Sequence, residues 1–140
     1  MIQVLQCEYG SEGFATCFDI RLRVFVLEQD VPVSEERDSC EEKALHYLAL
    51  ADCKPAGTAR SLIMAPGVIK IGRVAVLPAY RKSGVGAAVM RAVEAANPRA
   101  TFVLDAQIHA LPFYERLGFV AEGDQFQEAG IPHRRMKKIG

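Results

Sequence analysis

The chain has 140 residues, half of them hydrophobic, and its 17 basic side chains balance its 17 acidic ones. The length indicates one domain spanning residues 1–140, and the balanced charge gives no indication of a nucleic-acid or membrane partner. No apolar run approaches the roughly 20 residues that span a bilayer, and the N-terminus lacks the pattern of a signal peptide, so we expect a cytoplasmic protein.

In the first half of the chain, alternating apolar residues predict a strand over Ile2–Cys7. A helix is expected to begin at Ser11, and the charged stretch Asp30–Glu42 is typical of an irregular surface loop. Strands over Leu45–Ala51 and Ala56–Met64 then form a hairpin. The apolar side of the first helix is expected to comprise Phe14, Phe18, Leu22, Phe25 and Val26.

The middle of the chain predicts a strand followed by a helix. The strand covers Val68–Leu77, and the helix covers Gly84–Ala96, where apolar residues recur at helical spacing. Asn97-Pro98 ends that helix, because the residue before a proline disfavours the α conformation.

The C-terminal third predicts a strand over Thr101–Ala106 and a helical stretch over Ala110–Leu117, which Gly118 terminates. Phe119–Ala121 and Ile131–Lys138 are expected to be closing strands. This alternation of helices and strands indicates an α/β or α+β fold with a mixed sheet.

Four widely spaced cysteines form no Cys-x-x-Cys motif. In a cytosolic chain such cysteines are more often buried apolar residues than metal ligands or disulfide partners, although their number also permits two disulfides. We therefore expect buried thiols and no metal. The four are Cys7, Cys17, Cys40 and Cys53.

The segment Arg81-Lys82-Ser83-Gly84-Val85-Gly86 follows a strand and opens a helix. Glycines let the backbone approach a ligand closely, and the first N–H groups of a helix have no internal partner. With the helix dipole and the basic side chains, they predict a site for a diphosphate-bearing cofactor. The spacing is neither that of a P-loop nor that of the dinucleotide-binding fingerprint.

Several blocks together resemble the GCN5-related N-acetyltransferase (GNAT) superfamily. Residues 74–86 are similar to its acetyl-coenzyme A signature, and residues 113–119 to its second signature. The other blocks, residues 23–32 with Asp38 and His46, residues 105–107 and residues 129–133, resemble the ElaA/YjcF-like branch. The resemblance implies a mixed, mostly antiparallel sheet of six to seven strands with helices on both faces, which opens after the strand 68–77.

The resemblance also implies where acetyl-coenzyme A binds. The strand backbone pairs with the pantetheine arm, the loop N–H groups hold the pyrophosphate, Arg81 and Lys82 add their side chains, and Gln107 contacts the arm or an ordered water. The implied donor site comprises Val74, Ala75, Val76, Arg81, Lys82, Ser83, Gly84, Val85, Gly86, Ala87 and Gln107.

The resemblance implies one catalytic residue and leaves the general base to be sought among the residues of this chain. Tyr114 matches the position of the acid that protonates the leaving thiolate. Many members place a glutamate before the glycine loop, but here Gly72-Arg73 occupy that position, and Glu28 becomes the leading candidate for the general base. An already neutral amine needs no base. The alternative candidates are His46, His109 and His133, which have suitable intrinsic pKa values.

The acidic run after the first helix has two readings. We expect a solvated loop; if it lines the acceptor cleft instead, it favours a cationic amine. The run comprises Glu35, Glu36, Asp38, Glu41 and Glu42.

The function implied is transfer of an acetyl group from acetyl-coenzyme A to a primary amine of a small molecule or peptide, by direct attack in a ternary complex. The alternative is a coenzyme A-binding sensor or interaction module without turnover, which the absent glutamate at position 72 keeps open. Nucleotide hydrolysis is disfavoured, because neither a P-loop lysine nor a magnesium site is visible. Relatives are often dimers, so a homodimer is possible; the sequence does not identify the acceptor.

Overall fold

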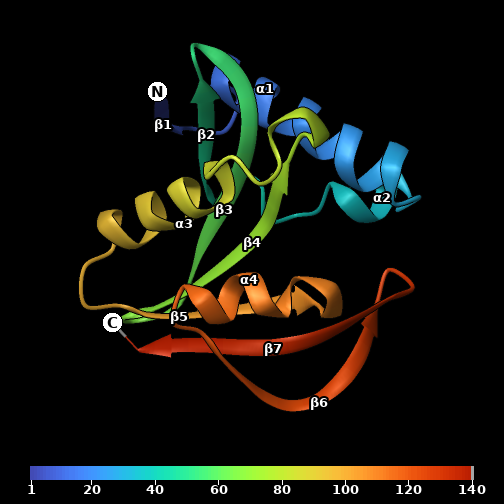
Figure 1. The fold of residues 1–140 in the computed structure, drawn as a ribbon, viewed down its shortest axis with the longest axis vertical. Coiled ribbons are helices and arrows are strands. Elements are labelled where there is room, and N and C mark those ends of the chain that lie inside the picture. The colour runs from blue at the N-terminus through green and yellow to red at the C-terminus, as the bar shows by residue number, and fades with distance from the viewer. Residues whose placement is uncertain (140) are drawn as a thin grey trace.

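A single seven-stranded sheet organises the protein, which we describe for residues 1–139 from a computed structural model (Figure 1). The strand order is β1-β2-β3-β4-β5-β7-β6, and every neighbouring pair is antiparallel except β4 and β5. This confirms the predicted mixed, mostly antiparallel sheet. The strands are β1 (Ile2–Cys7), β2 (Leu45–Ala51), β3 (Lys54–Ala65), β4 (Val68–Val76), β5 (Thr101–Gln107), β6 (Val120–Glu128) and β7 (Ile131–Ile139).

Helices cover both faces of the sheet (Figure 1). The first helix begins next to Ser11, close to the predicted start, and Ser11 caps it, because its Oγ accepts a hydrogen bond from the Phe14 N–H at 3.1 Å. None of the described helices is long and apolar enough to cross a membrane. The helices are α1 (Glu12–Arg21), the π-helix η1 (Leu22–Glu28), α2 (Val33–Glu36), the 3₁₀ turns η2 (Pro78–Tyr80) and η3 (Ile108–Ala110), α3 (Val85–Ala96) and α4 (Leu111–Arg116).

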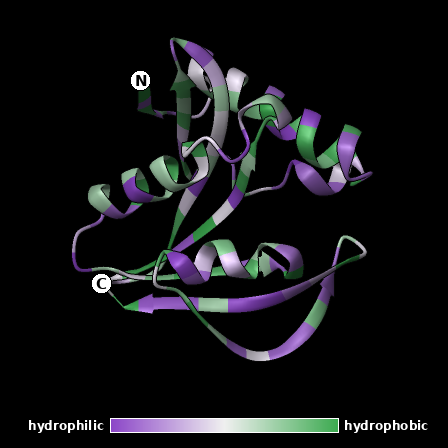
Figure 2. Ribbon diagram, in the orientation of Figure 1, coloured by the Kyte–Doolittle hydropathy of each residue, from purple (hydrophilic) through white to green (hydrophobic). Residues whose placement is uncertain are grey.

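Strands β2 and β4 carry stretches of hydrophobic residues, whereas β6 and β7 are largely hydrophilic (Figure 2). Alternate residues of a strand face opposite sides, so β2 contributes to two cores. Tyr47 and Ala49 belong to the larger core under α3 and α4, and Leu48 packs with Cys17 and Ile20 of α1. The central strands therefore hold helices on both faces.

Strands β4 and β5 pair only over Val68–Lys70 and Thr101–Val103, and then diverge (Figure 1). Beyond this point β4 bulges: Gly72 faces Arg60 of β3 but Ala75 faces Thr58, so β4 carries one extra residue. Arg73 occupies the bulge with φ = 52°. The expected opening of the sheet is therefore present, and it begins next to an irregularity in β4.

The expectation of a solvated acidic loop is wrong for Glu36 and Glu41, which are buried. Both bind the buried guanidinium of Arg21, whose Nε lies 2.6 Å from Glu36 Oε1 and whose Nη2 lies 2.7 Å from Glu41 Oε2. Buried charges require such partners. The pattern of charge alone could not show that Arg21 is buried.

Two further expectations need correction. Cys7 and Cys17 are buried, but Cys40 is only half-buried and Cys53 is exposed in the turn between β2 and β3; all four thiols are free. The last hairpin also begins with a longer strand than expected, because β6 runs to Glu128. Its mostly exposed residues lack the alternation that reveals a strand.

Replacing Arg21 by alanine should lower the free energy of unfolding by about 3–5 kcal/mol, because Glu36 and Glu41 lose the buried cation that they share and keep only their contacts with Arg73 and Arg60. Urea denaturation measures the change. The matched control is Arg23→Ala, which removes an exposed ion pair with Asp19 and should cost less than about 1 kcal/mol. Equal losses for the two variants would contradict the importance of the buried network.

Candidate functional site

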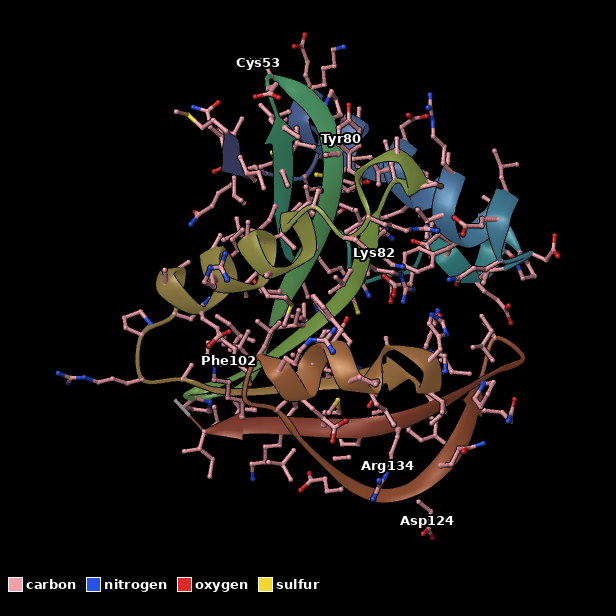
Figure 3. The ribbon with its side chains drawn as sticks, in the orientation of Figure 1. Cys53, Tyr80, Lys82, Phe102, Asp124 and Arg134 are labelled. Carbon is pink, nitrogen blue, oxygen red and sulfur yellow. The ribbon has the colours of Figure 1, made fainter. Side chains whose placement is uncertain are left out.

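The diverging strands enclose a cavity of about 790 Å³. It brings together most of the side chains and strand residues that the sequence suggested for the reaction, but not the loop residues from Lys82 to Ala87. Figure 3 places Lys82 in the loop that precedes α3. Among residues 1–139, no group of three or more His, Cys, Asp or Glu side chains is arranged to hold a metal ion. The suggested residues that line the cavity are Glu28, Val74, Ala75, Val76, Arg81, Gln107, His109, Tyr114 and His133.

The edge of β4 presents backbone groups to this cavity. The Leu77 N–H donates to Ala56 O on β3 at 2.9 Å. Because successive N–H groups of an extended strand point to opposite sides, the Val76 N–H points away from β3. It is therefore a donor on the side of β4 where pairing with β5 has ended.

The loop before α3 leaves the N-terminus of that helix open to a ligand. Gly84 is the N-cap residue with φ = 90°, and no side chain caps the helix. A side chain at Gly84 would lie near only Ile2 Cδ1, at 3.9 Å, so the space around it is open. The N–H groups of Val85, Gly86 and Ala87 lie in the first turn, where helices leave donors unpaired. These features suit a phosphate group.

Gly86 has a packing role in addition to the one that the motif suggested. A Cβ atom at this position would lie 3.0 Å from Phe113 Cζ, so the missing side chain lets α3 pack against α4. The glycine therefore also reflects helix packing. The sequence offered no signal for this contact, because it joins residues 27 positions apart.

Arg81 links the glycine loop to the end of η1. Its Nη1 and Nη2 each donate to the Glu28 carboxylate at 2.7 Å, and its Nε donates to Val76 O at 3.0 Å. The hydrogen bond and charge of Arg81 lower the pKa of Glu28. The two residues assigned separately to cofactor binding and base catalysis are thus partners.

Tyr114 is buried on α4 between Phe113 and Phe119, with ring centroids 4.9 Å and 6.1 Å away. Burial raises the pKa of its hydroxyl, because the phenolate is poorly solvated there. Tyr114 therefore keeps its proton at neutral pH, as a general acid must.

Gln107 forms a reciprocal amide pair with Gln29, a residue that sequence reasoning missed. Gln107 Nε2 donates to Gln29 Oε1 at 2.8 Å, and Gln29 Nε2 donates back at 3.3 Å. The pair joins β5 to the residue after η1. Only the spatial proximity of residues 78 positions apart identifies it.

The three histidines have different environments. His46 lies under α1, where its Nε2 is 3.0 Å from Glu41 O and burial lowers its pKa; it does not line the cavity. His109 is exposed at the cavity edge. His133 is buried in the cavity wall.

Part of the acidic run forms the opposite wall of the cavity. Asp38 Oδ2 lies 2.7 Å from Arg60 Nη2 and 3.3 Å from Arg73 Nη2. Arg73 also donates to Glu36 O. Arg73 lies where many family members have a glutamate, and here it anchors the segment around Glu36 to β4. Burial opposes the charged form of Asp38, but its hydrogen bonds and cationic neighbours outweigh burial and lower its pKa to about 2.

The whole chain is similar to known acetyltransferases. Residues 7–139 match the model of the acetyltransferase (GNAT) domain. The uncharacterized N-acetyltransferase YjcF of Bacillus subtilis is 40% identical over 133 residues, which cover 92% of this chain and 94% of that protein. An acyl-CoA N-acyltransferase from Pseudomonas aeruginosa (TM-score 0.83, 28% identity) and Escherichia coli ElaA (TM-score 0.85, 26% identity) each align over 99% of both chains.

Asp38 should make stability depend on acid pH. Because the folded pKa of about 2 lies below the ordinary value near 3.8, its contribution is present above pH 4 and is lost as the pH falls towards 2. We expect the free energy of unfolding of wild type to exceed that of Asp38→Asn by about 1–2 kcal/mol at pH 6, and we expect this difference to close near pH 2.

Urea denaturation at each pH measures the gap. Asp124→Asn is the control, since Asp124 lies exposed on β6 (Figure 3), and we expect changes below about 0.5 kcal/mol throughout. A gap for Asp38→Asn that is independent of pH would contradict the assignment.

Proposed function

Because the chain belongs to the acetyltransferase (GNAT) domain family, as its ElaA/YjcF-like motifs indicated, we propose that it transfers an acetyl group from acetyl-coenzyme A to a primary amine of a small molecule or peptide. The transfer takes place in a ternary complex, without an acyl-enzyme. The observation that carries the proposal is that the free edge of β4, Tyr114 and the polar wall formed by Asp38, Arg60 and Arg73 surround one cavity.

On the donor side, the pantetheine arm pairs with the backbone of Val74, Ala75 and Val76. The end of β4–β5 pairing after Lys70 supports this, since it leaves an edge that accepts an added strand. The N–H of Val76 then stabilises the oxyanion that forms on the thioester carbonyl.

The pyrophosphate binds the glycine loop before α3. Its donors are the backbone N–H groups of Lys82, Ser83, Gly84, Val85, Gly86 and Ala87. The uncapped helix and the open space at Gly84 support the assignment. Arg81 takes part by holding the adjoining Val76 carbonyl and Glu28 in place, and Gln107 offers its amide to the arm or to a water.

In the reaction, a neutral amine attacks the thioester carbon, and the C–S bond breaks with its electron pair on sulfur. Tyr114 donates its proton to that sulfur. The amine loses a proton as the amide forms. Glu28, the leading candidate for the base on sequence grounds, is weakened for that role by its bidentate bond to Arg81 and its lowered pKa.

The cavity favours a cationic acceptor, because more carboxylates than cationic side chains line it. The carboxylates are Glu28, Glu35, Glu36, Asp38, Asp105 and Glu128, and the cations are Arg60, Lys70, Arg73 and Arg81. Several of these carboxylates are bound to arginines. The preference for a cation therefore rests on the excess of carboxylates over cationic side chains in the cavity wall, and not on a single free carboxylate.

Release of the coenzyme A thiol from acetyl-coenzyme A tests the function. We expect release in the presence of at least one amine among benzylamine, spermidine and a lysine-containing peptide, with mass spectrometry showing the acetylated amine. Binding of acetyl-coenzyme A without release on this panel would favour the sensor or interaction module.

Tyr114→Phe should lower kcat by about 10²-fold and leave the Kd of acetyl-coenzyme A unchanged, because it removes the proton donor and keeps the ring. Thiol release and calorimetry measure the two quantities. Tyr9→Phe, a change at an exposed tyrosine of the β1–α1 turn, is the matched control with wild-type kcat. Unchanged turnover in Tyr114→Phe would remove the acid role.

Gly84→Ala should weaken acetyl-coenzyme A binding at least tenfold, because a side chain at φ = 90° distorts the loop that presents the N–H donors. Calorimetry measures the Kd. Gly123→Ala places the same strain at φ = 75° on β6 and should bind acetyl-coenzyme A like wild type. Equal affinities for Gly84→Ala and wild type would place the pyrophosphate elsewhere.

A further inference from the structure

His133 has an unused nitrogen in the wall of the reaction cavity. Its side chain is buried, with 7% of the residue exposed, and its Nδ1 lies 2.7 Å from Ile131 O. A carbonyl oxygen only accepts hydrogen bonds, so Nδ1 carries the hydrogen. In the neutral ring this leaves the lone pair on Nε2 free to accept a proton.

The β6–β7 hairpin fixes the orientation of this ring. Phe126, the cross-strand partner of His133 on β6, stacks on it with ring centroids 6.0 Å apart and planes inclined by 23°. Glu128 Oε2 lies 3.6 Å from Nε2. An imidazolium formed at His133 would therefore have a carboxylate beside the nitrogen that receives the proton.

His133 lies on the same face of the sheet as Gln107, which connects it to the end of η1 across the cavity. On β5 its direct partner is Gln107, so both side chains lie on the same face of the sheet. Gln107 in turn bonds Gln29, next to Glu28. The next charged side chain of β5 on this face, Asp105, is engaged by Lys70 and Arg135. Glu128 is thus the carboxylate that faces the imidazole within ion-pair distance.

We propose that His133 is the general base of the transfer and that Glu128 is its positioning residue; this rests on the proposed acetyltransferase function. Nε2 takes one proton from the ammonium form of the acceptor. The nitrogen lone pair then forms the C–N bond, the C–S bond breaks, and sulfur takes the electron pair and the Tyr114 proton. The tyrosine oxygen regains a proton from the amide nitrogen, and the His133 proton passes to solvent.

The structure favours His133 over the other candidates. Glu28 is bound at both oxygens by Arg81, and His46 lies outside the cavity with its Nε2 against a carbonyl. His109 is exposed and lacks a partner that fixes its ring among the described residues. Only His133 among these combines a fixed tautomer, burial in the cavity wall and an adjacent carboxylate.

The tautomer is measurable without any acceptor. The chain has three histidines, so long-range ¹H–¹⁵N spectra of the labelled protein resolve each ring, and loss of one set in His133→Asn assigns it. We expect the Nδ1–H tautomer for neutral His133. An Nε2–H tautomer would overturn the proposal, because Nε2 would then have no lone pair for the amine proton.

Kinetics test the role itself. Asparagine can keep a donor near Ile131 O but has no equivalent of Nε2, so His133→Asn should lower kcat/KM for the amine about 10²-fold at pH 7 and leave the Kd of acetyl-coenzyme A unchanged. The deficit should shrink to a few-fold near pH 10, where an ordinary alkylamine loses its proton unaided. The probe is whichever of benzylamine, spermidine or the lysine peptide wild type acetylates.

The control is Arg134→Ala, the next residue of β7, whose side chain points to the opposite face and bonds Gly123 O (Figure 3). It should retain wild-type kinetics. Wild-type kcat/KM in His133→Asn, or a deficit that persists at pH 10, would overturn the base assignment while leaving the acetyltransferase function intact. Absence of turnover by wild type with the whole panel would overturn both.

Glu128→Gln tests the positioning role. It should lower kcat about tenfold in the wild-type background and cause no further loss in His133→Asn, since the carboxylate acts only through the imidazole. Additive losses in the double variant would show that Glu128 acts independently of His133.

Discussion

The early end of pairing between β4 and β5 is the constraint on which the site depends. Two parallel strands that stayed paired over their full length would fill the space that the cavity occupies. Here pairing ends at Lys70 and Val103, and β4 bulges at Arg73. One edge of β4 thus stays available, and residues from η1, α4 and the β6–β7 hairpin face one another across the opening.

Two buried arginines and the half-buried Arg73 keep that opening in shape. Arg21 and Arg60 both bind Glu41, and Arg60 and Arg73 both bind Asp38, so an irregular segment is fixed to α1, β3 and β4 at once. Desolvated charges of this kind are costly unless each is paired. The network therefore fixes the geometry of this wall of the cavity more than it adds net stability.

The sequence allowed the element order, the sheet class, the family and the glycine loop to be predicted, because these depend on local periodicity and on contiguous motifs. It did not reveal the buried state of Glu36 and Glu41, the pairing of Arg81 with Glu28, or the role of Gln29, which depend on contacts between distant segments. The choice among the histidines likewise needed the fold. The three histidines have the same side chain, so only their burial and hydrogen-bond partners distinguish them.

The turn at Ala129–Gly130 has a consequence for how the chain can vary in length. Both residues have positive φ, 51° and 75°, which is typical of a two-residue hairpin turn. If the turn keeps two residues, one residue inserted after Glu128 shifts β6 by one position against β7 and places Glu128 on the opposite face, since side chains alternate along a strand. By contrast, β6 already accommodates extra residues between Glu122 and Phe126, opposite Arg135 and His133. The contact between Glu128 and His133 therefore depends on the length of the turn, whereas the irregularity farther along β6 coexists with that contact.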